Sequence, residues 1–239
     1  MNDYYANEIK EMNGIKEVGV VTLGHTELIY SEMLDKFVDW LNKEHNRTRE
    51  DIVKDGVFST ENTIKGIDSL TLRELNKTLP IDAEAFERGE IALINIKQYE
   101  DMADCFTDVS TLIVKRALDG TPIQIAVGGI VSLPRGGLTH SQMEILVSNN
   151  FMQQHYPQSQ MLYLDINVES GYDEQIYHTV ESTIDPAVVR VVSRYAARQA
   201  MQDAKTIMFV LGGGISLILG FIGIFNFINV GVQTRVCDA

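Results

Sequence analysis

Cysteine is scarce in this chain, and its scarcity excludes two common ways of stabilising a small domain. Cys105 and Cys237 are the only cysteines among 239 residues, so the sequence has neither a disulfide framework nor a cysteine-based zinc site. None of the five histidines lies three or four residues from another histidine or from a cysteine. A metal site therefore has no local support in the sequence, and we expect none.

Positive charge is also in short supply. The chain has 20 lysines and arginines against 33 aspartates and glutamates, which gives a formal net charge of -13. This acidity argues against binding to nucleic acid, whose phosphates would be repelled, and against flat docking on anionic lipid. It is compatible with a cationic partner such as a basic peptide, and equally with a surface that simply keeps the domain soluble.

Motifs for catalysis and for export are missing as well. No G-x-S-x-G sequence is present, and the pairs Gly128-Gly129 and Gly136-Gly137 lack the spacing of a phosphate-binding loop. The first five residues contain neither the basic nor the apolar part of a signal peptide. We therefore expect that the chain is not an enzyme and that it binds no cofactor of its own. Catalytic residues that converge from distant positions would leave no such motif.

The longest stretch without charge lies near the C-terminus. No charged residue occurs from Thr206 to Thr234. A helix rises about 1.5 Å per residue, and about 20 apolar residues are enough to cross the hydrocarbon core of a bilayer. The sequence therefore predicts one transmembrane helix over residues 206–232, followed by a short cytoplasmic tail at residues 233–239.

Small residues recur along this predicted transmembrane helix. Their intervals of three and four place them on one narrow face, and Asn226 falls near the same face. Small side chains let a second helix approach closely, and an asparagine side chain can hydrogen-bond across such a contact. The predicted helix-packing residues in the membrane are Gly212, Ser216, Gly220, Gly223, Asn226 and Asn229. The alternative is that glycine is simply common in membrane helices.

A second predicted helix leads directly into the span. Asp185-Pro186 has the pattern of an N-cap followed by proline at the first helical position, and neither glycine nor proline interrupts the chain as far as Lys205. We expect a rigid stalk over residues 186–205, continuous with the membrane helix. Its arginine stripe forms either a solvated face or a contact for an acidic partner, and consists of Arg190, Arg194 and Arg198. Taken alone, these charges place the preceding domain in the cytoplasm, by a rule that long domains obey poorly.

The residues before the stalk carry the patterns of an α+β domain. Alternating and β-branched residues predict strands at 15–23, 51–60, 89–96, 143–148 and 161–168, and a hairpin over 110–133 that turns at Asp119-Gly120. Apolar residues at helical spacing predict helices at 31–45, 150–155 and 173–184. The strand, helix and strand of residues 15–60 indicate a β-α-β unit.

The simplest architecture built from these elements has two parts. A split α/β subdomain of β-α-β, ferredoxin-like type is made from both ends of the domain, at residues 1–80 and 161–185. A β-rich subdomain is inserted between them at residues 81–160. The stalk helix and the transmembrane helix follow.

The membrane stretch resembles a known family. Residues Gly212 to Val230, GGGISLILGFIGIFNFINV, are similar to the second membrane helix of FtsX-like and MacB-like ABC transporter permeases, which has a glycine-rich start and then Ile-Gly-Ile-X-Asn-X-X-Asn. Residues Ile9 to Val18 resemble the start of that family's extracytoplasmic, porter-like domain, where a helix passes through glycine into the first strand. The tail at residues 233–239 departs from the family's usual continuation.

The resemblance implies a permease subunit at the cell membrane, with its N-terminal domain outside the cytoplasm. Through the stalk it would serve export or mechanical signalling involving a peptide, lipid or lipoprotein. The implied partners are an ABC ATPase subunit that binds ATP, other permease helices in a dimer, and membrane lipid, but not nucleic acid. Family members have further membrane helices before and after these segments, so we expect the sequence to be a fragment: a truncated product, a gene fragment or an excised piece. A single-pass anchored binding or sensor domain and a membrane-tethered enzyme remain the alternatives.

Overall fold

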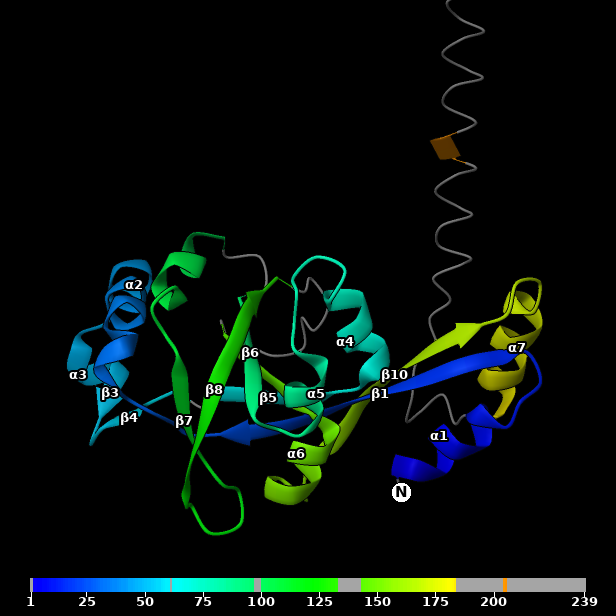
Figure 1. Ribbon diagram of the computed structural model, residues 1–239, viewed down its shortest axis with the longest axis horizontal. Helices are drawn as coiled ribbons and strands as arrows, with labels where there is room; N and C mark the ends of the chain where they lie inside the picture. Colours follow the sequence, from blue (N-terminus) through cyan, green and yellow to red (C-terminus); the bar gives the residue numbers. More distant parts are fainter. Residues whose placement is uncertain (1, 61, 97–99, 133–142, 184–203, 206–239) are drawn as a thin grey trace, which may run out of the picture. The chain divides into compact units, whose positions relative to one another are not determined.

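A computed structural model of the chain describes residues 2–60, 62–96, 100–132, 143–183 and 204–205. The chain divides into two compact units, residues 1–170 and 171–239. The first unit contains a ten-stranded sheet, shown in Figure 1. In the second unit the structure describes helix α7 (Asp173–Thr183), whose Ile176 and Val180 are buried. Helices together with a large mixed sheet confirm the predicted α+β class.

The first unit intersperses short helices among its strands. The strands are β1 (Ile15–Thr26), β2 (Leu28–Ile29), β3 (Val53–Lys54), β4 (Val57–Phe58), β5 (Asn62–Ile67), β6 (Ile91–Asn95), β7 (Thr111–Lys115), β8 (Pro122–Val131), β9 (Glu144–Ser148) and β10 (Gln160–Val168). The helices are α1 (Asn2–Lys10), the 3-10 helix η1 (Glu32–Leu34), α2 (Asp35–His45), α3 (Arg49–Ile52), α4 (Ser69–Leu75), α5 (Ala83–Glu87), the 3-10 helix η2 (Glu100–Phe106) and α6 (Asn149–His155).

The two faces of the sheet carry separate apolar cores. The strand order is β10-β1-β5-β9-β6-β8-β7-β2-β4-β3, and the pairs β5–β9 and β6–β8 are parallel. Neighbouring residues of a strand point to opposite faces, so Ile145 and Leu146 of β9 enter different cores. Helices α2 and α6 contribute to the core on one face, and helices α4 and α5 contribute to the core on the other.

Most of the predicted elements are confirmed. The strands predicted at 15–23, 89–96, 143–148 and 161–168 correspond to β1, β6, β9 and β10. The predicted hairpin is the antiparallel pair β7–β8, and Gly120 in its turn has a φ of 68°, in the left-handed region that glycine adopts most easily. The predicted helices appear as η1 with α2, as α6 and as α7.

The predicted β-α-β unit at residues 15–60 is wrong. The segment that follows α2 and α3 forms a short hairpin of β3 and β4, which pairs with β2 at the far edge of the sheet. Its turn at Asp55 and Gly56 has φ values of 53° and 76°, the conformation of a tight two-residue hairpin. The strand beside β1 on the side away from β10 is instead β5, and it runs antiparallel to β1.

Strand β5 is absent from the sequence prediction, although all six of its residues are buried. Lys65 interrupts the apolar alternation by which a half-buried strand is recognised. The folded chain neutralises this lysine with Glu144 of β9, a partner far away in the sequence. Burial of β5 is therefore a tertiary effect that the local pattern does not carry.

The sheet joins the two predicted subdomains, because β5 pairs with β9 and β2 pairs with β7. The division into residues 1–80 with 161–185 and an insert at 81–160 stays a prediction. Of the predicted stalk, the structure describes residues 204–205, and the predicted transmembrane helix lies outside the described residues. Among the helices that are described, none has the length and apolar character needed to cross a membrane.

Candidate functional site

The residues predicted to act in the membrane and in the stalk lie outside the part of the chain that the structure describes. They are Gly212, Ser216, Gly220, Gly223, Asn226 and Asn229 for helix packing, and Arg190, Arg194 and Arg198 for the stalk. Their roles stay predictions. The candidate site is therefore built from the first unit, at the place where the chain enters and leaves it.

The chain enters and leaves the sheet of the first unit side by side. Helix α1 ends at Lys10, and Gly14, with a φ of 90°, turns the backbone into β1. This confirms the helix, glycine and strand that the family resemblance implies at this end. Ile15 at the start of β1 pairs with Val168 at the end of β10, and the Glu169 N–H donates to the Gly14 carbonyl at 2.9 Å. Both connections of the unit are thus held together by hydrogen bonds.

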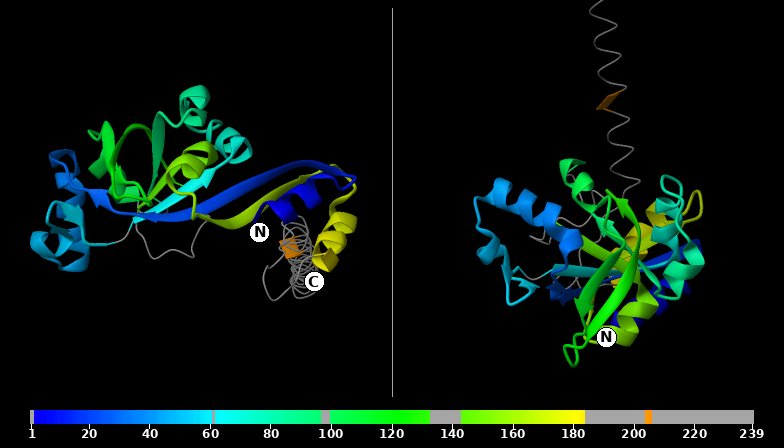
Figure 2. Two further views of the ribbon diagram at one scale, coloured as in Figure 1. Left: turned by 90° about the horizontal axis from the view of Figure 1, so that it is seen from below. Right: turned by 60° about the vertical axis from the view of Figure 1, so that its left-hand side comes forward.

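Strands β1 and β10 then form a two-stranded ribbon. Strand β5 pairs with β1 only from Thr22 to Thr26, so residues 15–21 have β10 as their one strand partner within the described residues. Figure 2 shows this ribbon running beyond the other strands, with α1 beside it. We call residues 15–21 with 163–168 the ribbon, and the remainder of the sheet with its helices the head. The ribbon therefore lies between the head and the two connections at Gly14 and Glu169.

A buried ion pair lies inside the head. Lys65 Nζ is 2.7 Å from Glu144 Oε1, and the two side chains are 3% and 0% exposed. From β6, Asn95 Nδ2 donates to Glu144 Oε2 at 2.9 Å. The three residues come from the adjacent strands β5, β9 and β6, so they link one parallel and one antiparallel strand pair. Because these groups are buried and bonded to each other, their arrangement fits a structural role.

The sequence does not single out this ion pair, although one signal was present. Lys65 is the only charged residue in the run from Thr63 to Ile67, and Glu144 opens the apolar run of β9. Opposite charges in two otherwise apolar strands are the pattern expected of a buried pair, because an unpaired charge is rarely tolerated in a core.

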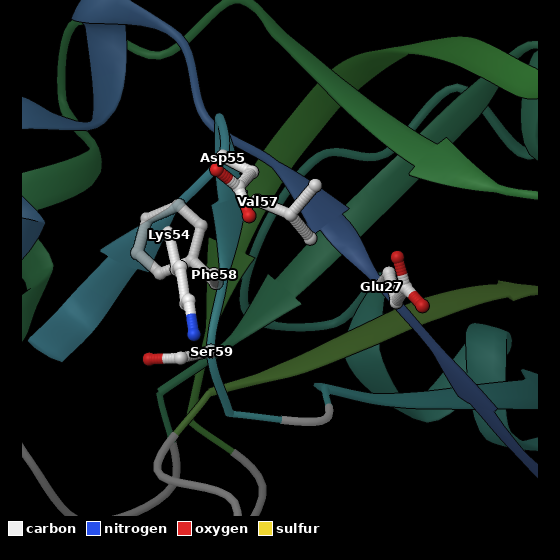
Figure 3. Close-up of a pocket in the computed structure, with 6 residues that line it drawn as sticks. All are labelled: Glu27, Lys54, Asp55, Val57, Phe58 and Ser59. Atoms are coloured by element: carbon white, nitrogen blue, oxygen red, sulfur yellow. The ribbon is translucent and has the colours of Figure 1, made fainter.

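A shallow hollow lies beside the β3–β4 hairpin. It has a volume of about 470 Å³ and is lined by Glu27, Lys54, Asp55, Val57, Phe58 and Ser59. Figure 3 shows Glu27 standing apart from the group on the hairpin. The Ser59 hydroxyl donates to backbone carbonyls, and the Glu27 carboxylate pairs with a lysine of β7. This use of its polar groups leaves the hollow a poor candidate for nucleophilic chemistry.

The described residues offer little to a metal or to a thiol reagent. No group of three or more histidine, cysteine, aspartate or glutamate side chains within them is placed to hold a metal ion. Cys105 is buried, and burial raises the pKa of its thiol, with the nearby charges of Asp101 and Asp104 adding to the shift. A thiol with a raised pKa carries less thiolate at neutral pH and reacts slowly.

No protein-family model matches the chain, and no curated protein matches it by sequence. Two solved structures have a similar fold. One is the extracellular domain of the noncanonic ABC-type transporter YknZ from Gram-positive bacteria, with 15% identity and a TM-score of 0.41, over 77% of this chain and 83% of that chain. The other is the periplasmic region of MacB from Actinobacillus actinomycetemcomitans, with 10% identity and a TM-score of 0.44, over 77% of this chain and 74% of that chain.

Proposed function

We propose that the first unit is the extracytoplasmic domain of an ABC transporter permease subunit, held at the cell membrane by the segment that follows it. The chain then comprises the domain, its stalk and one membrane helix of that subunit. Its role is mechanical rather than catalytic.

One observation carries the proposal: the chain enters and leaves the sheet of the first unit side by side, at Gly14 and Glu169. A domain inserted between two membrane helices needs this arrangement, because both helices start from the same surface of the bilayer. The uncharged residues 206–232 are long enough to supply the helix on the C-terminal side. Their sequence likeness to a permease helix supports the same assignment.

The ribbon is a path along which force can pass between the membrane connections and the head. Movement of either connection reaches the head through paired strands, which bend less readily than a flexible single-chain linker. The uninterrupted helical pattern of residues 186–205 extends this path toward the membrane. A paired ribbon and a helical stalk, both rigid, transmit displacement between the membrane and the head without absorbing it.

The finer parts of the proposal concern partners. An ABC ATPase subunit binds ATP on the cytoplasmic side, and sister helices, including those of a second copy, pack against the face formed by Gly212, Ser216, Gly220 and Asn226. The moved or sensed molecule is a peptide, a lipid or a lipoprotein. The net charge of -13 disfavours polyanionic partners such as nucleic acid.

A response to ATP tests the function. An environment-sensitive dye is attached to Lys16→Cys, an exposed ribbon position, in the full chain with Cys105 and Cys237 replaced by alanine. The protein is studied in membrane vesicles from the cells that encode it, with Mg-ATP supplied to the cytoplasmic face. We expect a change in dye emission with Mg-ATP, because closure of the ATPase subunits moves the ribbon.

Two controls define the outcome of this experiment. Mg-ADP should leave the emission close to its starting value, because it does not drive closure. The same dye on a water-soluble thiol in the same vesicles should not respond to either nucleotide. Emission from the ribbon that is identical with and without Mg-ATP would refute the proposed coupling to an ATPase.

A further inference from the structure

The ribbon meets the head at an irregular point. Val21 pairs with Tyr163, but the next residue, Thr22, pairs with Met161, so Leu162 is an extra residue on β10. A bulge of this kind interrupts the ladder of hydrogen bonds and bends the strand that carries it. Thr22 is also where β5 begins to pair with β1. The irregularity therefore coincides with the boundary between ribbon and head.

Asn149 spans this boundary with a single side chain. Its Nδ2 donates to the Val20 carbonyl at 2.8 Å, and its Oδ1 accepts a hydrogen bond from the Thr22 hydroxyl at 3.1 Å. Asn149 is the first residue of α6, which the buried side chains of Phe151 and Met152 anchor in the head. One amide group thus ties a ribbon residue and a head residue to the same helix.

Strand β5 is shaped to receive this contact. A Cβ atom at Gly66 would lie 2.3 Å from Thr22 Oγ1 and 2.4 Å from Asn149 Oδ1, closer than real Cβ atoms come. A side chain at this position would displace the hydrogen-bonded pair. Asn149 can reach the boundary because Gly66 has no side chain.

The contact on the opposite face of the ribbon is less complete. Asp68 caps α4 by accepting a hydrogen bond from the Thr71 N–H at 2.9 Å through Oδ1. Its Oδ2 is buried without a hydrogen-bond partner among the described residues, and a Cβ atom at Gly19 of the ribbon would lie 2.3 Å from it. A buried carboxylate oxygen without a partner is unfavourable and would regain water if the ribbon moved away. This face therefore favours release of the ribbon, whereas Asn149 opposes it.

We infer that the ribbon pivots on the head at Val21 and Thr22, and that Asn149 is the latch that holds it in the position seen in this structure. The latch is a positioning residue that acts through two hydrogen bonds. The inference rests on the proposed function for its purpose, since the pivot is where movement of the membrane connections becomes movement of the head. The geometry of the pivot belongs to the first unit alone.

The distance between ribbon and head tests the pivot. Spin labels are placed at Lys16→Cys on the ribbon and at Glu84→Cys on α5, both exposed, in the detergent-solubilised full chain without its native cysteines. Double electron–electron resonance then gives the distribution of distances. We expect one dominant distance with Asn149 in place. In Asn149→Ala we expect a second distance whose population grows roughly ten-fold, the order expected on losing two ordinary hydrogen bonds.

The control comes from the next residue of the same helix. Asn150→Ala makes the same substitution at an exposed position whose side chain bonds to the Glu87 carbonyl, and it should leave the distribution unchanged. Thr22→Val removes one of the two latch bonds with little change of shape, so it should shift the populations in the same direction by a smaller factor. It also serves as the deciding variant should Asn149→Ala fail to fold.

Two results would overturn the latch. One is an unchanged distance distribution in both Asn149→Ala and Thr22→Val. The other is an equal broadening in Asn150→Ala. Neither result bears on the response of the ribbon to Mg-ATP, so failure of the latch and failure of the proposed function are told apart.

Discussion

Replacing Glu144 with leucine is expected to lower the free energy of unfolding by about 3–5 kcal/mol, because it leaves the Lys65 ammonium buried without its counter-charge. The two side chains are 3% and 0% exposed, and their charged atoms are 2.7 Å apart. The side-chain amide of Asn95 loses an acceptor in the same substitution. For a unit of this size the loss corresponds to a fall in Tm of roughly 10 °C, which thermal unfolding followed by circular dichroism measures directly.

Two further variants separate a buried pair from a general effect of the substitution. The double change Lys65→Met with Glu144→Leu should recover much of the loss, because apolar residues of similar volume often replace a buried ion pair at little cost. Glu90→Leu breaks an exposed ion pair with Arg88 and should cost less than about 1 kcal/mol. A loss below about 1 kcal/mol in Glu144→Leu itself would show that this pair is not buried as described.

Gly66→Ala is expected to lower the free energy of unfolding by about 2–3 kcal/mol through overpacking. The added methyl group would meet Thr22 Oγ1 at 2.3 Å, Asn149 Oδ1 at 2.4 Å and Met152 Cγ at 2.6 Å. None of these atoms is the free end of a flexible side chain, and two of them form one of the two hydrogen bonds between Asn149 of α6 and β1. Chemical denaturation measures the loss of unfolding free energy, provided that the slope of this free energy against denaturant concentration is the same in both proteins.

Gly24→Ala is the matched control for this substitution. Its new methyl group would also face Met152, but at the terminal Cε atom 3.0 Å away, with Ile64 Cγ2 at 3.3 Å. A terminal methyl group moves aside easily, so we expect a cost below about 1 kcal/mol. Equal losses at Gly24 and Gly66 would mean that the crowding around Asn149 is not specific.

The sequence was most informative where structure depends on neighbouring residues. The β7–β8 hairpin follows from two apolar runs and the Asp119-Gly120 turn between them, and all three are visible in a short window. Helix α2 follows from apolar residues at helical spacing, and its Phe37, Val38 and Leu41 are buried as that spacing predicts. Such features need no knowledge of distant partners.

The features of the fold and of the site that the sequence did not predict depend on residues that lie far apart in the chain. Lys65 is buried beside Glu144, a partner that lies 79 positions later in the chain. The hydrogen bond from Thr22 to Asn149 joins residues 127 positions apart, so the latch has no local signature. The mistaken β-α-β unit has the same cause, because adjacency in the chain was taken for adjacency in the sheet.

The membrane location of the chain, with its head outside the cytoplasm, is the claim on which the account depends. Leu118 is 62% exposed in the turn between β7 and β8, so Leu118→Cys, with Cys105 and Cys237 replaced by alanine, reports on access to the head. Leu112→Cys, 1% exposed in β7, is the matched control that should react only after unfolding. The reporter is introduced into the gene in its own cells.

The decisive measurement treats these intact cells with a membrane-impermeant maleimide and then extracts their membranes with alkaline carbonate. We expect Leu118→Cys to be labelled before the cells are broken and the labelled chain to stay in the membrane pellet. A chain that is labelled only after lysis and that appears in the carbonate supernatant would contradict this expectation.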